Sequence, residues 1–219
     1  MIFNSEDYLS YKRDKKSNSQ IDQDLFVRYM LQDKLNGYFV DFGATDGISY
    51  SNSYIFEKEY GWDGIVCEPN KFYQPDLLKN RTCHIDFNCV YTQTGTTIPF
   101  YEVDQQDLST ISTYSDKDHH RAARTSRKEY DVEIITLKDL MDKYNAPKII
   151  DYLSIDTEGS EYTILSNYDF SRSFKVITVE HNHVEDNRNK IYSLLTEKGY
   201  ERIPTEFSSF DDWYVLYII

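Results

Sequence analysis

Short apolar runs alternate with helical stretches along most of this chain, and this alternation constrains the fold most strongly. Apolar runs typical of buried strands occupy residues 38–42, 64–67, 149–155 and 175–179. Helical stretches lie between them or before them, and the clearest places its apolar residues near one face within residues 21–35. Strands that alternate with helices usually form a mostly parallel, doubly wound sheet that is covered on both faces.

Further strand candidates extend this pattern. They occupy residues 82–90, residues 97–103 after a glycine turn, and residues 132–136. The last apolar run, residues 213–219, is not followed by a helix, so we expect an antiparallel strand at an edge of the sheet. No internal repeat interrupts the order. The sequence therefore predicts one α/β domain over residues 19–219.

Two polar segments depart from the alternation. Residues 1–18 show little periodicity, and we expect them to form a flexible or loosely docked arm. Residues 104–130 are rich in Ser, Asp, Lys and Arg. A connection this long inside a compact domain is either a lid over a binding site or disordered, and the sequence leaves both open.

Charge and cysteine usage narrow the classes of partner. The net charge of −13 disfavours nucleic acid and anionic membrane surfaces, because both would repel the chain. No apolar stretch approaches the roughly 20 residues of a membrane span, and the first residues lack the apolar segment of a signal peptide. Three irregularly spaced cysteines suit buried thiols in a reducing compartment. We therefore expect a cytoplasmic protein.

A glycine turn follows the first predicted strand. Asp41, Gly43 and Gly47 form the pattern D-x-G-x-x-x-G, in which glycine lets the backbone turn tightly and approach a ligand. The pattern differs from the G-x-G-x-x-G fingerprint of dinucleotide sites. Its acidic residues suit a ligand with a free amine, such as the methionine part of S-adenosylmethionine. One βα unit later, Glu68 ends a strand before Pro69, where a carboxylate accepts ribose hydroxyls in related folds.

Carboxylates and histidines follow two later strands that should be neighbours. Asp156 and Glu158 come after the strand at residues 149–155, and Glu180 and His181 follow the strand at 175–179. Ligands of open α/β sheets bind at the carboxyl ends of the strands. We therefore expect these side chains to lie over a reacting centre.

The chain resembles the FkbM-type methyltransferases. The resemblance rests on six stretches in family order, spread from Ser19 onward: SQIDQD (19–24), YFVDFGATDGISYSNSY (38–54), GWDGIVCEPN (61–70), YLSIDTEGSEYTIL (152–165), VITVEHN (176–182) and LLTEKGY (194–200). It implies a Rossmann-like class I methyltransferase that uses S-adenosylmethionine and acts on a hydroxyl of a sugar or natural product. Residues 1–18 and 104–130 show no match.

The resemblance also implies a set of cofactor-binding residues. Asp41, Gly43 and Gly47 would lie against the cofactor, Glu68 would bind the ribose, Asn88 and Cys89 would lie near the adenine, and Ser51 and Asn52 would contact the methionine carboxylate. The full set expected at the cofactor is Asp41, Gly43, Ala44, Asp46, Gly47, Ser51, Asn52, Glu68, Pro69, Asn88, Cys89 and Asp156.

Two mechanisms for removing the acceptor proton remain open. A hydroxyl oxygen is a poor nucleophile without help from a base or a metal. His181 would act as the general base, oriented by Asp156 or Glu158. Alternatively, Asp156, Glu180 and His181 would hold Mg²⁺, because oxygen ligands suit a hard cation.

The functional expectation is thus an S-adenosylmethionine-dependent O-methyltransferase with a sugar, a glycan or a related small molecule as acceptor. The alternative is a catalytically inactive binding protein that kept the methyltransferase fold. A NAD-dependent oxidoreductase is a third reading, and the missing fingerprint speaks against it. The sequence does not indicate the oligomeric state.

Overall fold

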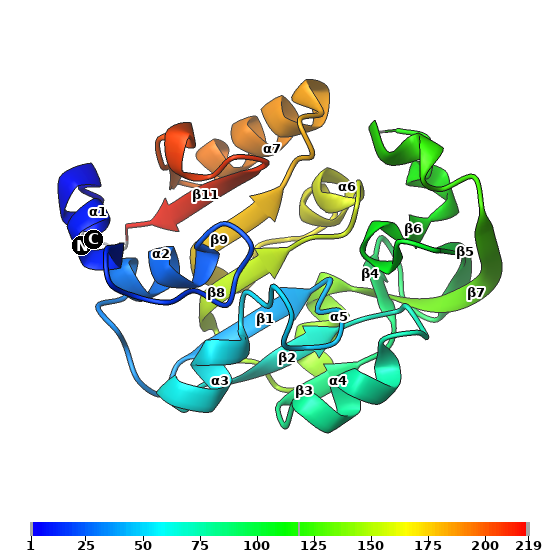
Figure 1. Ribbon diagram of the computed structural model, residues 1–219, viewed down its shortest axis with the longest axis horizontal. Helices are drawn as coiled ribbons and strands as arrows, with labels where there is room; N and C mark the ends of the chain where they lie inside the picture. The colour runs from blue at the N-terminus through cyan, green and yellow to red at the C-terminus, as the bar shows by residue number, and fades with distance from the viewer. Residues whose placement is uncertain (1, 118, 218–219) are drawn as a thin grey trace.

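The structure is a computed structural model that describes residues 2–117 and 119–217, and it contains two sheets (Figure 1). The larger sheet has the order β10-β11-β9-β8-β1-β2-β3. Its strands are β1 (Tyr38–Phe42), β2 (Asp63–Cys67), β3 (His84–Asp86), β8 (Ile149–Ile155), β9 (Ser173–Glu180), β10 (Tyr200–Arg202) and β11 (Asp211–Leu216). The five strands from β9 to β3 run parallel. The mostly parallel sheet predicted from the sequence is confirmed.

The C-terminal strand lies one position inside the sheet edge. β11 pairs antiparallel with β9, as expected, and on its other side it pairs antiparallel with β10. The short strand β10 therefore supplies the edge that the sequence had assigned to the last strand. Residues 218–219, the end of that predicted strand, lie outside the described residues.

Helices cover both faces of the larger sheet. They are α2 (Gln23–Met30), α3 (Tyr54–Tyr60), α4 (Gln74–Asn80), α5 (Leu137–Lys143), α6 (Glu161–Ser166) and α7 (Glu185–Glu197). Neighbouring residues of β1 separate the two cores: Val40 packs with the apolar side chains of α5, α6 and α7, whereas Phe39 packs with those of α2, α3 and α4. This alternation follows from the two-residue period of a strand that is buried on both faces.

The N-terminal residues form a docked helix, whereas the sequence predicted a flexible or loosely docked arm over residues 1–18. Helix α1 (Ser5–Lys12) begins after Asn4, whose side chain accepts from the backbone N–H of Asp7. Tyr8 is fully buried and makes edge contacts with Phe26 of α2 and Trp213 of β11. Aromatic contacts of this kind fix the segment on the sheet. Residue 1 lies outside the described residues.

A second sheet flanks the long connection predicted over residues 104–130, and only β6 and the first residues of β7 fall within that connection. Its order is β4-β7-β5-β6, with β4 (Cys89–Tyr91), β5 (Thr96–Val103), β6 (Thr110–Ile111) and β7 (Arg127–Thr136). Three short 3-10 helices, η1 (Gln106–Leu108), η2 (Ser112–Tyr114) and η3 (His119–Ala122), complete the connection between β5 and β7. The strand predicted over residues 82–90 is divided, because β3 joins the larger sheet and β4 joins the second one.

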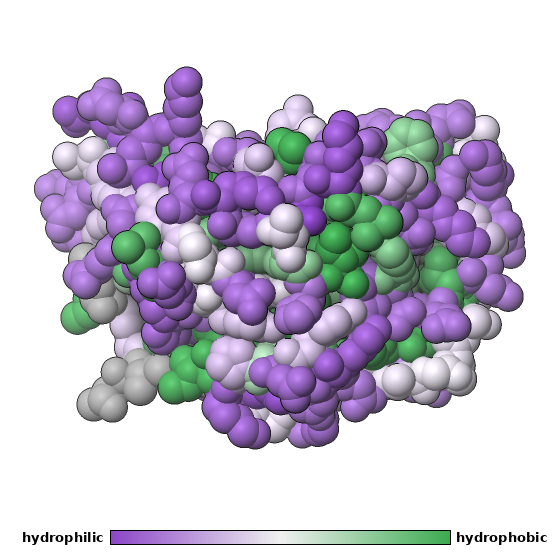
Figure 2. Space-filling view, turned by 90° about the horizontal axis from the view of Figure 1, so that it is seen from below, coloured by the Kyte–Doolittle hydropathy of each residue, from purple (hydrophilic) through white to green (hydrophobic). Residues whose placement is uncertain are grey.

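The surface is largely made of hydrophilic residues. The face seen in Figure 2 is mostly hydrophilic, and its apolar residues lie in small groups. Within the described ranges, no helix is both long enough and apolar enough to cross a membrane.

Candidate active site

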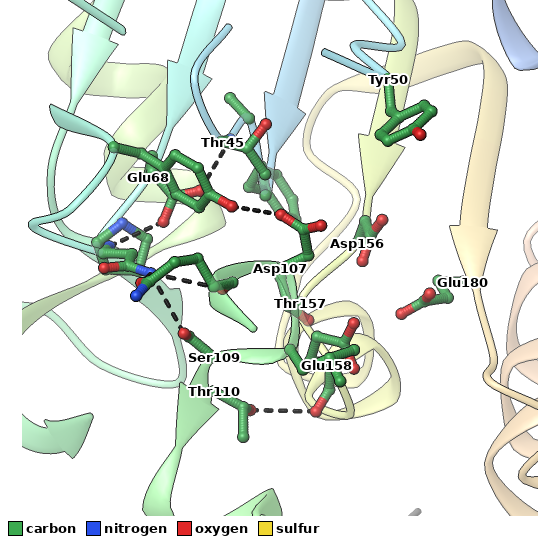
Figure 3. A pocket seen from close by; sticks show the side chains of 18 of the residues that line it. Thr45, Tyr50, Glu68, Asp107, Ser109, Thr110, Asp156, Thr157, Glu158 and Glu180 are labelled. Atoms are coloured by element: carbon green, nitrogen blue, oxygen red, sulfur yellow. Dashed lines mark hydrogen bonds between the residues drawn. The ribbon is translucent and has the colours of Figure 1, made fainter. Parts of the chain in front are cut away.

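A cavity of about 590 Å³ lies at the carboxyl ends of β1, β2, β8 and β9, beside the second sheet (Figure 3). This volume is in the range of small-molecule and cofactor sites. Loop residues after each of these strands line it, together with residues 105–111 of the segment that leads into β6. The site is therefore at the strand ends that the sequence indicated.

Gly43 allows the turns after β1 and β8 to meet. Its φ of +88° is in the left-handed region, and a Cβ atom there would lie 1.9 Å from the carbonyl oxygen of Asp156. The backbone N–H of Asp156 donates to the carbonyl of Phe42 at 3.1 Å. Because any side chain at position 43 would push Asp156 away, glycine is required to bring this carboxylate next to the first turn.

Gly47, also expected at the cofactor, serves a different contact. It does not line the cavity, and a Cβ atom there would approach Arg81 and Leu77 at 2.7 and 2.8 Å. The glycine thus permits close packing of the turn on α4. Asp46 does line the cavity, and its carboxylate accepts from the N–H groups of Ile48 and Ser49 at 2.8 and 2.7 Å.

Glu68 is held with both carboxylate oxygens fixed at the end of β2. One oxygen accepts from the N–H of Thr45 at 2.9 Å and the other from the N–H of Asn70 at 2.8 Å. The side chain is only 5% exposed. Burial raises the pKa of Glu68 to about 7, although these two hydrogen bonds lower it. Each oxygen keeps a lone pair for a ligand hydroxyl, as the ribose role requires.

Residues from the long connection reach this side of the cavity, in line with the lid alternative, although the sequence did not predict the individual contacts. The Asn70 amide donates to the side chains of Gln106 and Ser109 at 3.0 and 3.2 Å, and Tyr73 donates to Asp107. Asn70 belongs to the matching stretch 61–70, but its residue type alone gives no role. The contacts arise because β5 and β7 pair and carry η1 over the end of β2.

Asn52 lines the cavity and has a buried acceptor atom without a partner in the described part of the chain. Its amide nitrogen donates to Ser154 at 3.0 Å, while its Oδ1 atom is buried without a hydrogen-bond partner in the described part of the chain. An unpaired buried acceptor is costly, so this atom suits a ligand N–H group. Ser51 accepts from the N–H of Tyr54 at 3.1 Å, and Asp41 accepts from Ser53 at 2.5 Å, so both also brace the start of α3.

The remaining residues expected at the cofactor divide between the cavity wall and its surroundings. Ala44, Pro69 and Cys89 line the cavity. Asn88 does not line the cavity, and its backbone N–H donates to Asp86 at 2.9 Å in the turn between β3 and β4. Cys89 therefore lies where a ligand could contact it, and its role near the adenine stays a prediction.

Three carboxylates converge beyond the glycine turn. One oxygen from each of Asp156, Glu158 and Glu180 lies within 4.8 Å of the others. The Asn182 amide donates to Glu158 at 3.2 Å and to Glu180 at 2.8 Å, and Arg124 donates to Glu158 at 2.8 Å. All three carboxylates were expected here, whereas Arg124 and the role of Asn182 as a bridge depend on the tertiary structure.

Asp156 and Glu180 interact as a carboxyl pair. Burial raises the pKa of Asp156, and a hydrogen bond with Glu180 opposes this rise. Burial, followed by the charge of Asp156, raises the pKa of Glu180 well above its ordinary value. The ligand-free pair therefore favours a shared proton, since two adjacent carboxylates with little access to solvent do not both ionise readily.

His181 lies outside the cavity, which corrects its expected roles as general base and metal ligand. Its ring is 1% exposed, with Nε2 3.2 Å from the carbonyl oxygen of Asp211 and Nδ1 accepting from the N–H of His183 at 3.0 Å. Burial lowers the pKa of His181 despite the opposing charge of Asp212. The next residues turn the other way, so Asn182 and His183 line the cavity instead.

Comparison with known proteins agrees with this architecture. Residues 41–202 match the family described as the methyltransferase FkbM domain. A methyltransferase FkbM structure from Methylobacillus flagellatus KT is 11% identical with a TM-score of 0.50, and the match covers 95% of this chain and 57% of that one. At this low identity, the likeness shows that the two proteins share a fold. No curated protein matches the chain.

Two other solved structures are more distant in shape. The precorrin-6y C5,15-methyltransferase from Geobacter metallireducens GS-15 is 12% identical, with a TM-score of 0.46 over 94% of this chain and 96% of that one. A putative S-adenosylmethionine-dependent methyltransferase from Methanococcus maripaludis is also 12% identical, with a TM-score of 0.41 over 99% of this chain and 96% of that one.

Proposed function

Because the chain belongs to the FkbM methyltransferase family and has the class I methyltransferase fold, we propose that it is an S-adenosylmethionine-dependent O-methyltransferase. Its acceptor is a hydroxyl group of a sugar, a glycan or a related small molecule. The observation that carries the cofactor assignment is Glu68, whose two oxygens are fixed by backbone N–H groups and face the cavity.

The hydrogen-bond acceptors around the cavity fit this cofactor. Glu68 would accept the two ribose hydroxyls, and the unpaired Oδ1 atom of Asn52 would accept an N–H of the methionine ammonium group. Cys89 would lie at the adenine side. When bound, S-adenosylmethionine supplies an electrophilic methyl group on its sulfonium. With one shared proton, the pair of Asp156 and Glu180 keeps one negative charge, which favours a cation in the cavity.

Asp156 is our candidate for the general base. It lies in the cavity next to the glycine turn, and Glu180 is held beside it by Asn182. In its ionised state Asp156 accepts the proton of the acceptor hydroxyl, and the hydrogen bond with Glu180 keeps the carboxylate oriented. Glu158 is a positioning residue, since its carboxylate is already engaged by Arg124 and Asn182.

The alternative is that a metal ion lowers the pKa of the acceptor hydroxyl. Asp156, Glu158 and Glu180 offer oxygen ligands, which suit Mg²⁺. However, Arg124 pairs with the Glu158 carboxylate at 2.8 Å, and His181 is turned out of the cavity. The residues present therefore do not form a suitable Mg²⁺ site, and we favour the base.

Calorimetry followed by turnover measurements tests this proposal. We expect saturable binding of S-adenosylhomocysteine, and activity with an acceptor from a glycoside screen that is unchanged in EDTA. Asp156→Asn should lower kcat by roughly 100-fold or more, because a carboxamide does not take the proton. Asp169→Asn, a change at an exposed carboxylate remote from the cavity, is the matched control.

Three outcomes would contradict the proposal at different levels. Loss of activity in EDTA that Mg²⁺ restores would replace the base with a metal. Binding of S-adenosylhomocysteine without turnover of any acceptor would favour a catalytically inactive methyltransferase-fold protein. A wild-type chain that binds NAD⁺ and not S-adenosylhomocysteine would overturn the cofactor assignment itself.

A further inference from the structure

Tyr50 is an exposed aromatic residue in the wall of the cavity. Its side chain is 66% exposed, although it lines the same cavity as Glu68 and Asp156. Large exposed aromatic rings at a binding site are unusual without a ligand to cover them, because their burial is favourable. The ring is therefore available to a molecule that enters the cavity.

The turn that carries Tyr50 is held by several hydrogen bonds. Asp46 accepts from two N–H groups of this turn, and its own carbonyl accepts from the Asn80 amide at 2.8 Å. Arg81 donates to the carbonyl of Gly47 at 3.3 Å. Tyr50 itself has a φ of +55°, a conformation that costs energy in a residue other than glycine. These contacts fix the backbone of the turn that carries Tyr50 before a ligand binds.

The position of the ring separates it from the ribose site. In Figure 3, Glu68 lies to the left of Asp156, whereas Tyr50 lies above Asp156 and slightly to the right, and Glu180 lies to the right of Asp156. A molecule bound at Glu68 and at the glycine turn would leave this second side of the cavity for the acceptor. The candidate base Asp156 lies between the two sides.

The charges of the cavity limit what this side accepts. Its wall includes the carboxylates of Asp46, Asp107, Asp156, Glu158 and Glu180, whereas no Lys or Arg is among the lining residues of the described ranges. The whole chain has a net charge of −13. An acceptor that carries phosphate, sulfate or carboxylate would be repelled here, and a neutral or cationic molecule would not.

We propose that Tyr50 is the specificity-determining platform for the acceptor, on which a ring with an apolar face stacks, and that this acceptor carries no anionic group. The negative face of an aromatic ring attracts the C–H groups of such a ring, and its exposed edge leaves the hydroxyls free to reach Asp156. The proposal rests on the proposed methyltransferase function and specifies the acceptor side of the same site.

Saturation-transfer NMR on protein loaded with S-adenosylhomocysteine tests the platform. The probes are neutral methyl hexosides and methyl glucuronide, the carboxylate counterpart of methyl glucoside. We expect at least one neutral hexoside to bind, and methyl glucuronide to bind more weakly than methyl glucoside. Tyr50→Ala should weaken hexoside binding about tenfold, whereas Tyr50→Phe should keep it within about twofold.

Two controls separate this proposal from the one on which it rests. Affinity for S-adenosylhomocysteine should be unchanged in both Tyr50 variants, and Tyr192→Ala, at another exposed tyrosine far along the chain on α7, should bind hexosides like the wild type. Hexoside binding that Tyr50→Ala leaves intact, tighter binding of the glucuronide, or no hexoside binding by the loaded wild type would overturn the platform. Failure of the wild type to bind S-adenosylhomocysteine would instead overturn the proposed function.

Discussion

At the scale of single residues, Glu68 shows how a buried carboxylate is prepared for a ligand. Backbone N–H groups of Thr45 and Asn70 hold its two oxygens and favour the charged form, but burial outweighs them. The pKa therefore rests at about 7 in the ligand-free protein. Hydroxyl groups that donate to these oxygens would restore part of the lost solvation and favour ionisation.

This balance predicts a pH-dependent affinity for S-adenosylhomocysteine. Because the hydroxyls bind the ionised form best, affinity should be full above the Glu68 pKa of about 7 and fall as the pH drops below it. Glu68→Gln should weaken binding roughly tenfold and flatten this dependence. Calorimetry across this pH range measures both effects. An unchanged slope in the variant would show that another group is responsible.

The Glu68→Gln variant needs a stability control. The Gln side chain would turn an amide nitrogen toward the N–H of Thr45 or Asn70, which replaces an acceptor with a donor. Its melting temperature is therefore measured beside the binding, with Glu59→Gln at an exposed position of α3 as the matched substitution.

At the scale of elements, the segment from η1 to the start of β7 is attached to the cavity through Arg124. This side chain is 1% exposed and donates from Nε to the carbonyl of Leu108 at 2.7 Å and from its terminal nitrogen to Glu158 at 2.8 Å. Thr110 donates to the carbonyl of Glu158 at 3.1 Å. The segment thus meets the turn after β8 through a buried ion pair.

Replacement of Arg124 should release this segment. Arg124→Met leaves the Glu158 carboxylate without its buried cation, which costs about 3 kcal/mol or more of stability. We expect faster hydrogen exchange in residues 105–124, measured by mass spectrometry, and weaker protection by S-adenosylhomocysteine. Arg121→Met is the control, since this arginine belongs to the same segment and its side chain is exposed. Equal exchange in wild type and Arg124→Met would exclude the ion pair as the attachment.

A lid over residues 104–130, one of the two alternatives that the sequence left open, would move when ligands bind. Residues 105–111 line the cavity, so their movement would open or close it. Hydrogen exchange of the wild type with and without both ligands tests this, and equal protection in the two states would remove the segment from the mechanism.

At the scale of the whole molecule, buried acids should make the ligand-free protein less stable as the pH rises. Burial raises the pKa of Asp211 to about 8 and that of Glu68 to about 7, so the folded state keeps protons that the unfolded state loses. Stability from these groups is therefore present at low pH and lost as the pH rises through these values. The lowered pKa of His181 has the opposite effect on stability. Below pH 6.5, the ordinary pKa of histidine, the unfolded state binds a proton more readily than the folded state, so stability falls as the pH drops.

We therefore predict that the free energy of unfolding falls by about 2 kcal/mol between pH 6.5, the ordinary pKa of histidine, and the Asp211 pKa of about 8. Urea unfolding at a series of pH values measures this change. Asp211→Asn should reduce it, since Asn still accepts from Gln23 at the same position without a charge to bury. Stability that rises over this interval would contradict the burial argument.

The sequence alone predicted the parts that depend on neighbouring residues. Strands buried on both faces, such as β1 and β8, appear as short apolar runs, because each residue must be apolar to pack on one side or the other. Gly43, Glu68 and Asp156 follow directly from such strands, so their place at one edge of the sheet was predictable. The expected α/β fold and the family resemblance are confirmed on this basis.

Tertiary contacts decided the rest. Helix α1 looked like an arm because its aromatic residues find their partners on other elements, among them α2 and the distant strand β11. The pairing of β5 with β7 created the second sheet and brought Arg124 to Glu158. His181 was misplaced for a similar reason: the strand ends at Glu180, and the ring then turns toward the backbone of β11, a direction set by a distant strand and not by the local pattern.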